Sequence, residues 1–150
     1  MARMVNIVAI ILGFISDTVA TFIFTFLCAV AVSIIMSSQG VEGPALEAKL
    51  QEFLTGREFL LFSTLSGLGF TMMGGYVAGR IAKQGELFHA GAVGFINILF
   101  GLYFMSHYPS WYVIVVLLVI PAALIGGDKA KRFNRRNKDR IPQAPPSDTE

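Results

Sequence analysis

Three long stretches of this chain are almost free of charge. The stretch 4–41 holds a single charged residue, Asp17, while 59–79 and 87–127 hold none. Each stretch contains at least one apolar run of about 20 residues, which as a helix rising 1.5 Å per residue crosses the hydrocarbon core of a bilayer. Charged residues make up 15% of the chain, against about 25% in soluble domains. The sequence therefore predicts a polytopic membrane protein.

The apolar runs are continuous and do not alternate with polar residues, which favours helices over the strands of a membrane barrel. We predict an all-α protein, a four-transmembrane-helix antiparallel bundle. It forms a membrane domain over 1–128, with spanning helices at about 5–36, 58–80, 87–106 and 109–127.

The first apolar run also resembles a signal peptide, because Arg3 precedes it. A cleavable apolar region is only about 7–15 residues long, and this run continues to Met36. We therefore expect the first helix to be retained. The loop 37–57 is predicted to contain a short helix that starts at Pro44, a residue favoured at the first helical position.

Lysine and arginine are unevenly distributed over the predicted loops. Ten lie on the side of the two termini and only two, Lys49 and Arg57, on the other. Because short loops rich in Lys and Arg stay in the cytoplasm, we expect both termini to be cytoplasmic.

The segment 129–150 is basic and then proline-rich, a composition typical of disorder. We expect its basic part to contact anionic lipid head groups, at about 1 kcal/mol per charge. Nucleic acid is a less favoured partner, because aromatic interleaving and a recognisable binding fold are lacking. The expected head-group contacts are Lys129, Lys131, Arg132, Arg135 and Arg136.

Small residues recur at helical spacing along the second and third predicted helices. Helices in lipid associate where small residues let their backbones approach, so we expect these two stripes to pack together. A phosphate loop is disfavoured for the segment 74–80, because it lies at a helix C-terminus, where the dipole repels anions. The segment 126–132 shares the spacing GGxxAxR, which we interpret as two similar helix ends. The expected packing glycines are Gly67, Gly74, Gly75, Gly79, Gly94 and Gly101.

The segment GGYVAGRIAK at 74–83 is followed by ELFHAGAVG at 86–94. This pairing resembles the hairpin of many small, uncharacterised four-helix bacterial membrane proteins, which share GGYxAx(R/K)xA and then H(A/G)xxxG. The resemblance covers about residues 74–94. It implies a bacterial inner-membrane location and no particular activity.

Asp17 is the most informative polar residue. A carboxylate at the bilayer centre costs about 2.5–3.5 kcal/mol, so it should face the protein interior or a water-filled cavity. At 1.5 Å of rise per residue, Thr71 and Asn97 lie at overlapping depths, and the three residues can form an intramembrane polar cluster. Asp17 is then either a protonated hydrogen-bond donor that joins helices or a site for a proton or cation.

Catalytic and metal-binding patterns are not found. The two histidines, at opposite ends of the third helix, are about 27 Å apart, and no Cys or His spacing suits zinc. We therefore expect no enzyme activity, catalytic residue, metal or other cofactor. The favoured function is a non-enzymatic structural or accessory component of a membrane assembly, with a larger membrane protein or a homo-oligomer as partner. The alternative is a small oligomeric transporter or channel that uses Asp17 as a proton- or cation-binding site.

Overall fold

A computed structural model describes residues 5–104 and 111–140 of the protein. These residues form five helices, and all except α2 are long and apolar enough to cross a membrane. The prediction of an all-α protein with four spanning helices is confirmed. The helices are α1 (Ile7–Ser38), α2 (Pro44–Thr55), α3 (Arg57–Ala82), α4 (Glu86–Phe104) and α5 (Tyr112–Arg140).

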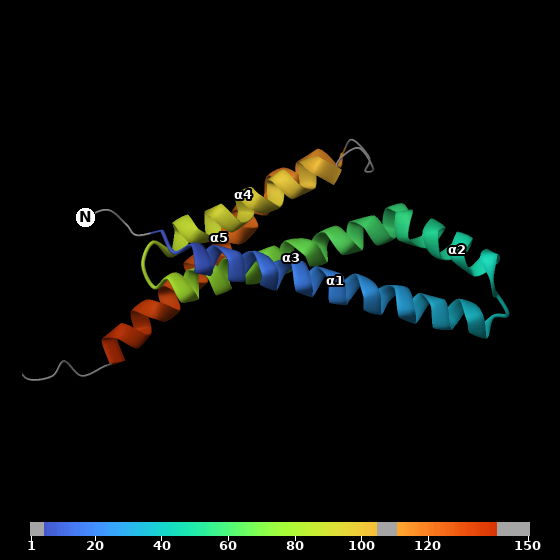
Figure 1. Ribbon diagram of the computed structural model, residues 1–150, viewed down its shortest axis with the longest axis horizontal. Helices are drawn as coiled ribbons and strands as arrows, with labels where there is room; N and C mark the ends of the chain where they lie inside the picture. Colours follow the sequence, from blue (N-terminus) through green and yellow to red (C-terminus); the bar gives the residue numbers. More distant parts are fainter. Residues whose placement is uncertain (1–4, 105–110, 141–150) are drawn as a thin grey trace, which may run out of the picture.

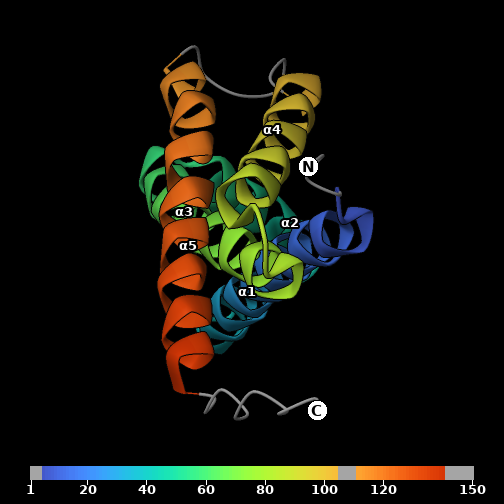
Figure 2. The same ribbon diagram turned by 90° about the vertical axis from the view of Figure 1, so that its left-hand side faces the viewer.

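The spanning helices form two hairpins that meet at one end and diverge at the other. In Figure 1, α1 and α3 run side by side towards α2, while α4 and α5 run away from them at an angle. Figure 2 shows α5 extending beyond the start of α4. We call the shared end, with the start of α1, the turn at 83–85 and the last half of α5, the basic end. The end that carries α2 is the opposite end.

Helix α3 lies between α1 and α5, and two consecutive glycines make this possible. A Cβ atom added to Gly74 would lie 2.7 Å from the carbonyl oxygen of Gly13 on α1. A Cβ added to Gly75 would overlap the carbonyl oxygen of Ala123 on α5. Because consecutive residues point about 100° apart around a helix of 3.6 residues per turn, the pair serves two neighbours.

Helix α5 repeats this arrangement with its own pair of glycines. A Cβ added to Gly126 would overlap the carbonyl oxygen of Met72 on α3, and one added to Gly127 would lie 2.6 Å from Cβ of Ala90 on α4. The segments 74–80 and 126–132, which share their spacing, therefore lie against each other. Their likeness reflects a common packing surface as well as a similar position near the basic end.

The expected contact between the stripes of α3 and α4 is wrong for Gly94 and Gly101. A Cβ added to Gly94 would lie 3.1 Å from Cβ of Ala123, and one added to Gly101 would lie 3.3 Å from Cγ2 of Val116, so both face α5. The physical reason is that the glycine faces of α3 are already covered by α1 and α5.

Gly67 also differs from the expectation, because no atom beyond its own surroundings lies within 4 Å of a Cβ built on it. It lies between Gly74 and the opposite end, where the two hairpins diverge (Figure 1). It therefore lines an open space and makes no helix contact.

The fourth spanning helix was expected to end at 127 and to be followed by a disordered segment, but α5 continues to Arg140. Asn134 fastens this extension, since its Nδ2 donates to the carbonyl oxygen of Gly79 at 3.2 Å and to Glu86 Oε1 at 3.3 Å. The guanidinium of Arg80 lies 3.8 Å from the ring centre of Phe133. These contacts explain why the basic segment is helical; 141–150 lie outside the described residues.

The α3–α5 contact predicts opposite effects for two glycine substitutions. Gly126→Ala should destabilise the fold by about 1–3 kcal/mol or more, because its methyl group meets the backbone of α3. Gly69→Ala, where nothing lies within 4 Å, should be neutral or stabilise by up to about 1 kcal/mol through helix propensity. Reversible unfolding by SDS in mixed micelles, followed by circular dichroism, measures both. Equal stability of the two variants would contradict the close contact.

Candidate functional site: an intramembrane carboxyl beside a cavity

Asp17 lies in the interior where α1, α3 and α4 meet, and its side chain is 5% exposed. Thr71 Oγ1 donates a hydrogen bond to Asp17 Oδ2 at 3.0 Å, and Asn97 Nδ2 donates to the same oxygen. Thr21, one turn further along α1, lines the same cavity as the carboxyl. The structure therefore brings together Asp17, Thr71 and Asn97, the three residues of the expected cluster, and adds Thr21.

The close crossing of α1 and α3 positions this cluster. Asp17 follows Gly13 by four residues and Thr71 precedes Gly74 by three, spacings that lie on one face of a helix. A Cβ added to Gly74 would lie 2.9 Å from Cβ of Asp17. On α4, Asn97 follows the fully buried Val93 by one turn. The three polar groups thus stand one turn beyond the tightest packing on each helix.

The hydrogen bonds have the magnitude needed to place a carboxyl there. Interhelical hydrogen bonds in membranes contribute about 0.6 kcal/mol on average and up to about 1.7, while the carboxylate costs about 2.5–3.5 kcal/mol. Two such bonds to one carboxyl offset a cost of the same order. Their chemical effect is to tie three helices to a single side chain.

A cavity of about 290 Å³ adjoins the carboxyl. It shares Thr21, Gly67 and Tyr112 with a second cavity of about 610 Å³ that continues towards α2. Their lining residues come from α1, α3, α4 and α5, and those of the larger cavity also from the end of α2. Together they form a cleft that leads from Asp17 towards the opposite end.

The polar lining of this cleft follows helical spacing on two helices. Asp17, Thr21 and Thr25 recur every four residues on α1, and Ser63, Gly67 and Thr71 do so on α3. The α3 residues were expected to form a packing stripe. We had not singled out Thr25 as a site residue, although its spacing of eight residues from Asp17 is a signal that could have identified it.

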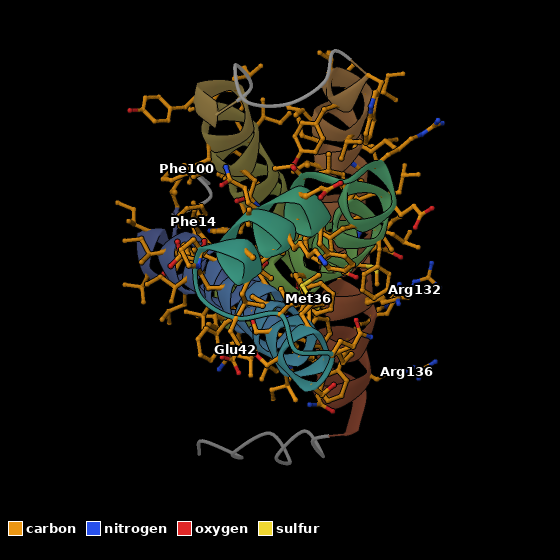
Figure 3. The ribbon with its side chains drawn as sticks, turned by 90° about the vertical axis from the view of Figure 1, so that its right-hand side faces the viewer. Phe14, Met36, Glu42, Phe100, Arg132 and Arg136 are labelled. Carbon is orange, nitrogen blue, oxygen red and sulfur yellow. The ribbon has the colours of Figure 1, made fainter. Side chains whose placement is uncertain are left out.

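Aromatic rings form another part of the lining that sequence reasoning missed. Phe14 on α1 and Phe100 on α4 have ring centres 5.2 Å apart, and both line the cavity beside Asp17. They are labelled next to each other in Figure 3. They lie 86 positions apart in the sequence, so no local spacing pattern could pair them.

His89, at the start of α4, is one of the most deeply buried polar residues and is 2% exposed. Its Nδ1 lies 2.9 Å from the carbonyl oxygen of Gly85, and its Nε2 accepts from the backbone N–H of Asn6 at 2.9 Å. These partners fit a neutral imidazole with its hydrogen on Nδ1. The ring therefore joins the start of α1 to the start of α4, a structural role.

The basic segment of α5 presents its charges outwards. Arg132 pairs with Asp128 at 2.8 Å, and Arg132 and Arg136 point away from the helix in Figure 3. The five expected head-group contacts all have exposed side chains: Lys129, Lys131, Arg132, Arg135 and Arg136. Within 5–104 and 111–140, no group of three His, Cys, Asp or Glu side chains is placed to hold a metal ion.

The fold and this cluster define a multi-pass α-helical membrane protein with a hydrogen-bonded carboxyl in its core. Comparison with models of protein families, with curated proteins and with solved structures gave no match to the chain.

The cluster predicts that Asp17→Leu destabilises the fold by about 1–3 kcal/mol, because the buried donors lose their acceptor. Asp17→Asn should cost less, since the amide oxygen still accepts. The control Asp128→Asn breaks an exposed pair and should change stability by less than about 1 kcal/mol. SDS unfolding in mixed micelles measures the stability of all three variants. If Asp17→Leu were as stable as the wild type, the hydrogen bonds to Asp17 would not hold the helices together.

His89 allows a second prediction. Nitrogen NMR of the labelled ring should find the hydrogen on Nδ1, because Nε2 accepts from Asn6. In His89→Phe the amide of Asn6 should exchange with deuterium about tenfold faster, as expected for loss of a hydrogen bond worth about 1–1.5 kcal/mol. The control Phe95→Leu, at an exposed position on the same helix, should leave the exchange unchanged. An Nε2–H tautomer would contradict the assignment.

Proposed function

We propose that this chain is a non-enzymatic structural or accessory component of a membrane assembly. The observation that carries the proposal is the clamp at Asp17, in which the carboxyl is hydrogen-bonded to Thr71 and Asn97 of two other helices. Next to it, towards the basic end, α1 and α3 meet at Gly13 and Gly74 with no room for even a methyl group. Such packing suits a rigid body that holds a fixed shape in the bilayer.

The lipid-exposed surface supports a partner. Large apolar side chains cover α1 beyond its crossing with α3, among them Phe22, at 73% exposed, and Phe26, at 67%. Another membrane helix can replace the acyl chains around these side chains without loss of apolar contact. We therefore propose a larger membrane protein as the partner, with self-association of this chain as the alternative.

The orientation belongs to the same proposal. We place the basic end in the cytoplasm of a bacterial cell, at the inner membrane, because it carries the excess of Lys and Arg. The exposed charges of α5 then reach the anionic leaflet, each contributing about 1 kcal/mol. Reporter fusions at the two termini should both report the cytoplasm, and opposite faces would contradict the orientation.

A second candidate is a small transporter that uses Asp17 as a proton- or cation-binding site. The observation in its favour is the cleft, which leads from Asp17 towards the opposite end. Towards the basic end the path is occupied by the Gly13–Gly74 contact. Transport would therefore require the α1 and α3 backbones to separate, a rearrangement of the best-packed part of the molecule.

One experiment separates the two candidates. The tagged chain is crosslinked in its native membranes before extraction, and the same chain is reconstituted into liposomes for measurements of proton and monovalent cation flux. The accessory function predicts a stoichiometric larger partner, retained by a folded Asp17→Asn variant, and flux no greater than in empty liposomes. Recovery of this chain alone, with a flux that Asp17→Asn abolishes, would overturn the accessory function in favour of transport.

A further inference from the structure

The cavity beside Asp17 combines one carboxyl with aromatic walls. Phe14 lines it from α1, Phe100 from α4 and Tyr112 from α5. Phe14 is three residues before Asp17, so the ring and the carboxyl share a face of α1. A carboxyl with aromatic side chains beside it in one cavity is an arrangement that suits organic cations.

The carboxyl retains capacity for another partner. An ionised carboxylate offers about four acceptor positions on its two oxygens. Thr71 and Asn97 account for two hydrogen bonds, and both are accepted by the single oxygen Oδ2. A positive charge at the cavity wall would therefore be attracted to Asp17 without displacing the bonds that hold the helices.

The size and lining of the space select the kind of cation. A volume of about 290 Å³ is far larger than the roughly 30 Å³ occupied by one water molecule, so it has room for an organic cation. The adjoining cavity of about 610 Å³ adds aliphatic side chains, including Leu60, Leu68 and Val119, and the hydroxyls of Thr25 and Ser63. This continuation suits an apolar substituent.

We propose that this cleft binds an organic ammonium cation with apolar substituents, its charge held by Asp17 and by the ring faces of Phe14 and Phe100. The apolar part of the ligand extends towards α2 into the larger cavity. Binding of this kind is compatible with an accessory protein or with a transporter, so it goes beyond the proposed function. Its failure would leave the crosslinking result unaffected.

The test uses radiolabelled benzyltrimethylammonium and the full chain in phosphatidylcholine liposomes, which carry no net charge to bind the probe. Equilibrium dialysis should detect saturable binding to the wild-type protein. Neopentylbenzene has the same shape with carbon in place of the charged nitrogen. It should compete at least about tenfold less well, as expected where a charge interaction in an apolar site dominates.

Four variants assign the binding to this cleft. Asp17→Asn should weaken it by about tenfold or more, and Phe100→Leu by about three- to tenfold, because the aliphatic replacement keeps the apolar surface but removes the ring. Asp128→Asn and Phe95→Leu change the same residue types at positions that do not line the cleft. Both controls should bind like the wild type.

Three results would overturn the proposal: no saturable binding to the wild-type protein, equal competition by neopentylbenzene, or unchanged affinity in both Asp17→Asn and Phe100→Leu. Equal competition would assign the cleft to neutral apolar molecules such as acyl chains. If Asp17→Asn does not fold, as judged by circular dichroism, the comparison of the two isosteres on the wild type and the Phe100→Leu result decide the question.

Discussion

The close approach of backbones at adjacent glycines is the constraint on which the rest of this structure depends. Lipid supplies little hydrophobic drive between helices, so their association relies on contact area and polar bonds. Gly74 turns one bare face of α3 to α1, and Gly75 turns the next to α5. A single pair of residues thereby fixes three of the four spanning helices, and Gly94 and Gly101 pack α4 against α5.

The glycine contact also determines where a polar group can be tolerated. Gly13 and Gly74 bring α1 and α3 so close that Asp17 and Thr71, one turn further on, fall within hydrogen-bond distance. At a wider crossing, donor and acceptor would both lack partners in hydrocarbon, where each unsatisfied polar group costs several kcal/mol. The polar cluster therefore depends on the close glycine packing beside it.

The sequence was sufficient for properties that depend on one helix at a time. The four spans follow from apolar length, and the depths of Asp17, Thr71 and Asn97 follow from rise per residue. Contacts between helices were harder, because a small residue shows that a close contact is possible but not which helix makes it; Gly94 and Gly101 face α5 for this reason. The predicted end of α5 was wrong because a run of charged residues marks the end of the membrane span but not the end of the helix. Ala130 and Asn134 continue to pack on α3 beyond the apolar run.

The proposed roles of the Asp17 carboxyl, holding helices together and attracting a cation, require different chemical properties. A clamp needs only an acceptor, which an amide oxygen also provides, whereas attraction of a cation needs negative charge. Asp17 lies where the dry glycine contact gives way to the cleft, so one side of it faces helix partners and the other faces open space. One turn nearer the basic end on the same face is Gly13, where not even a methyl group fits, so position 17 is the first that can carry a carboxyl. At this boundary the carboxyl has helix partners on one side and the cleft on the other, which is the physical argument that the cleft and the carboxyl act together.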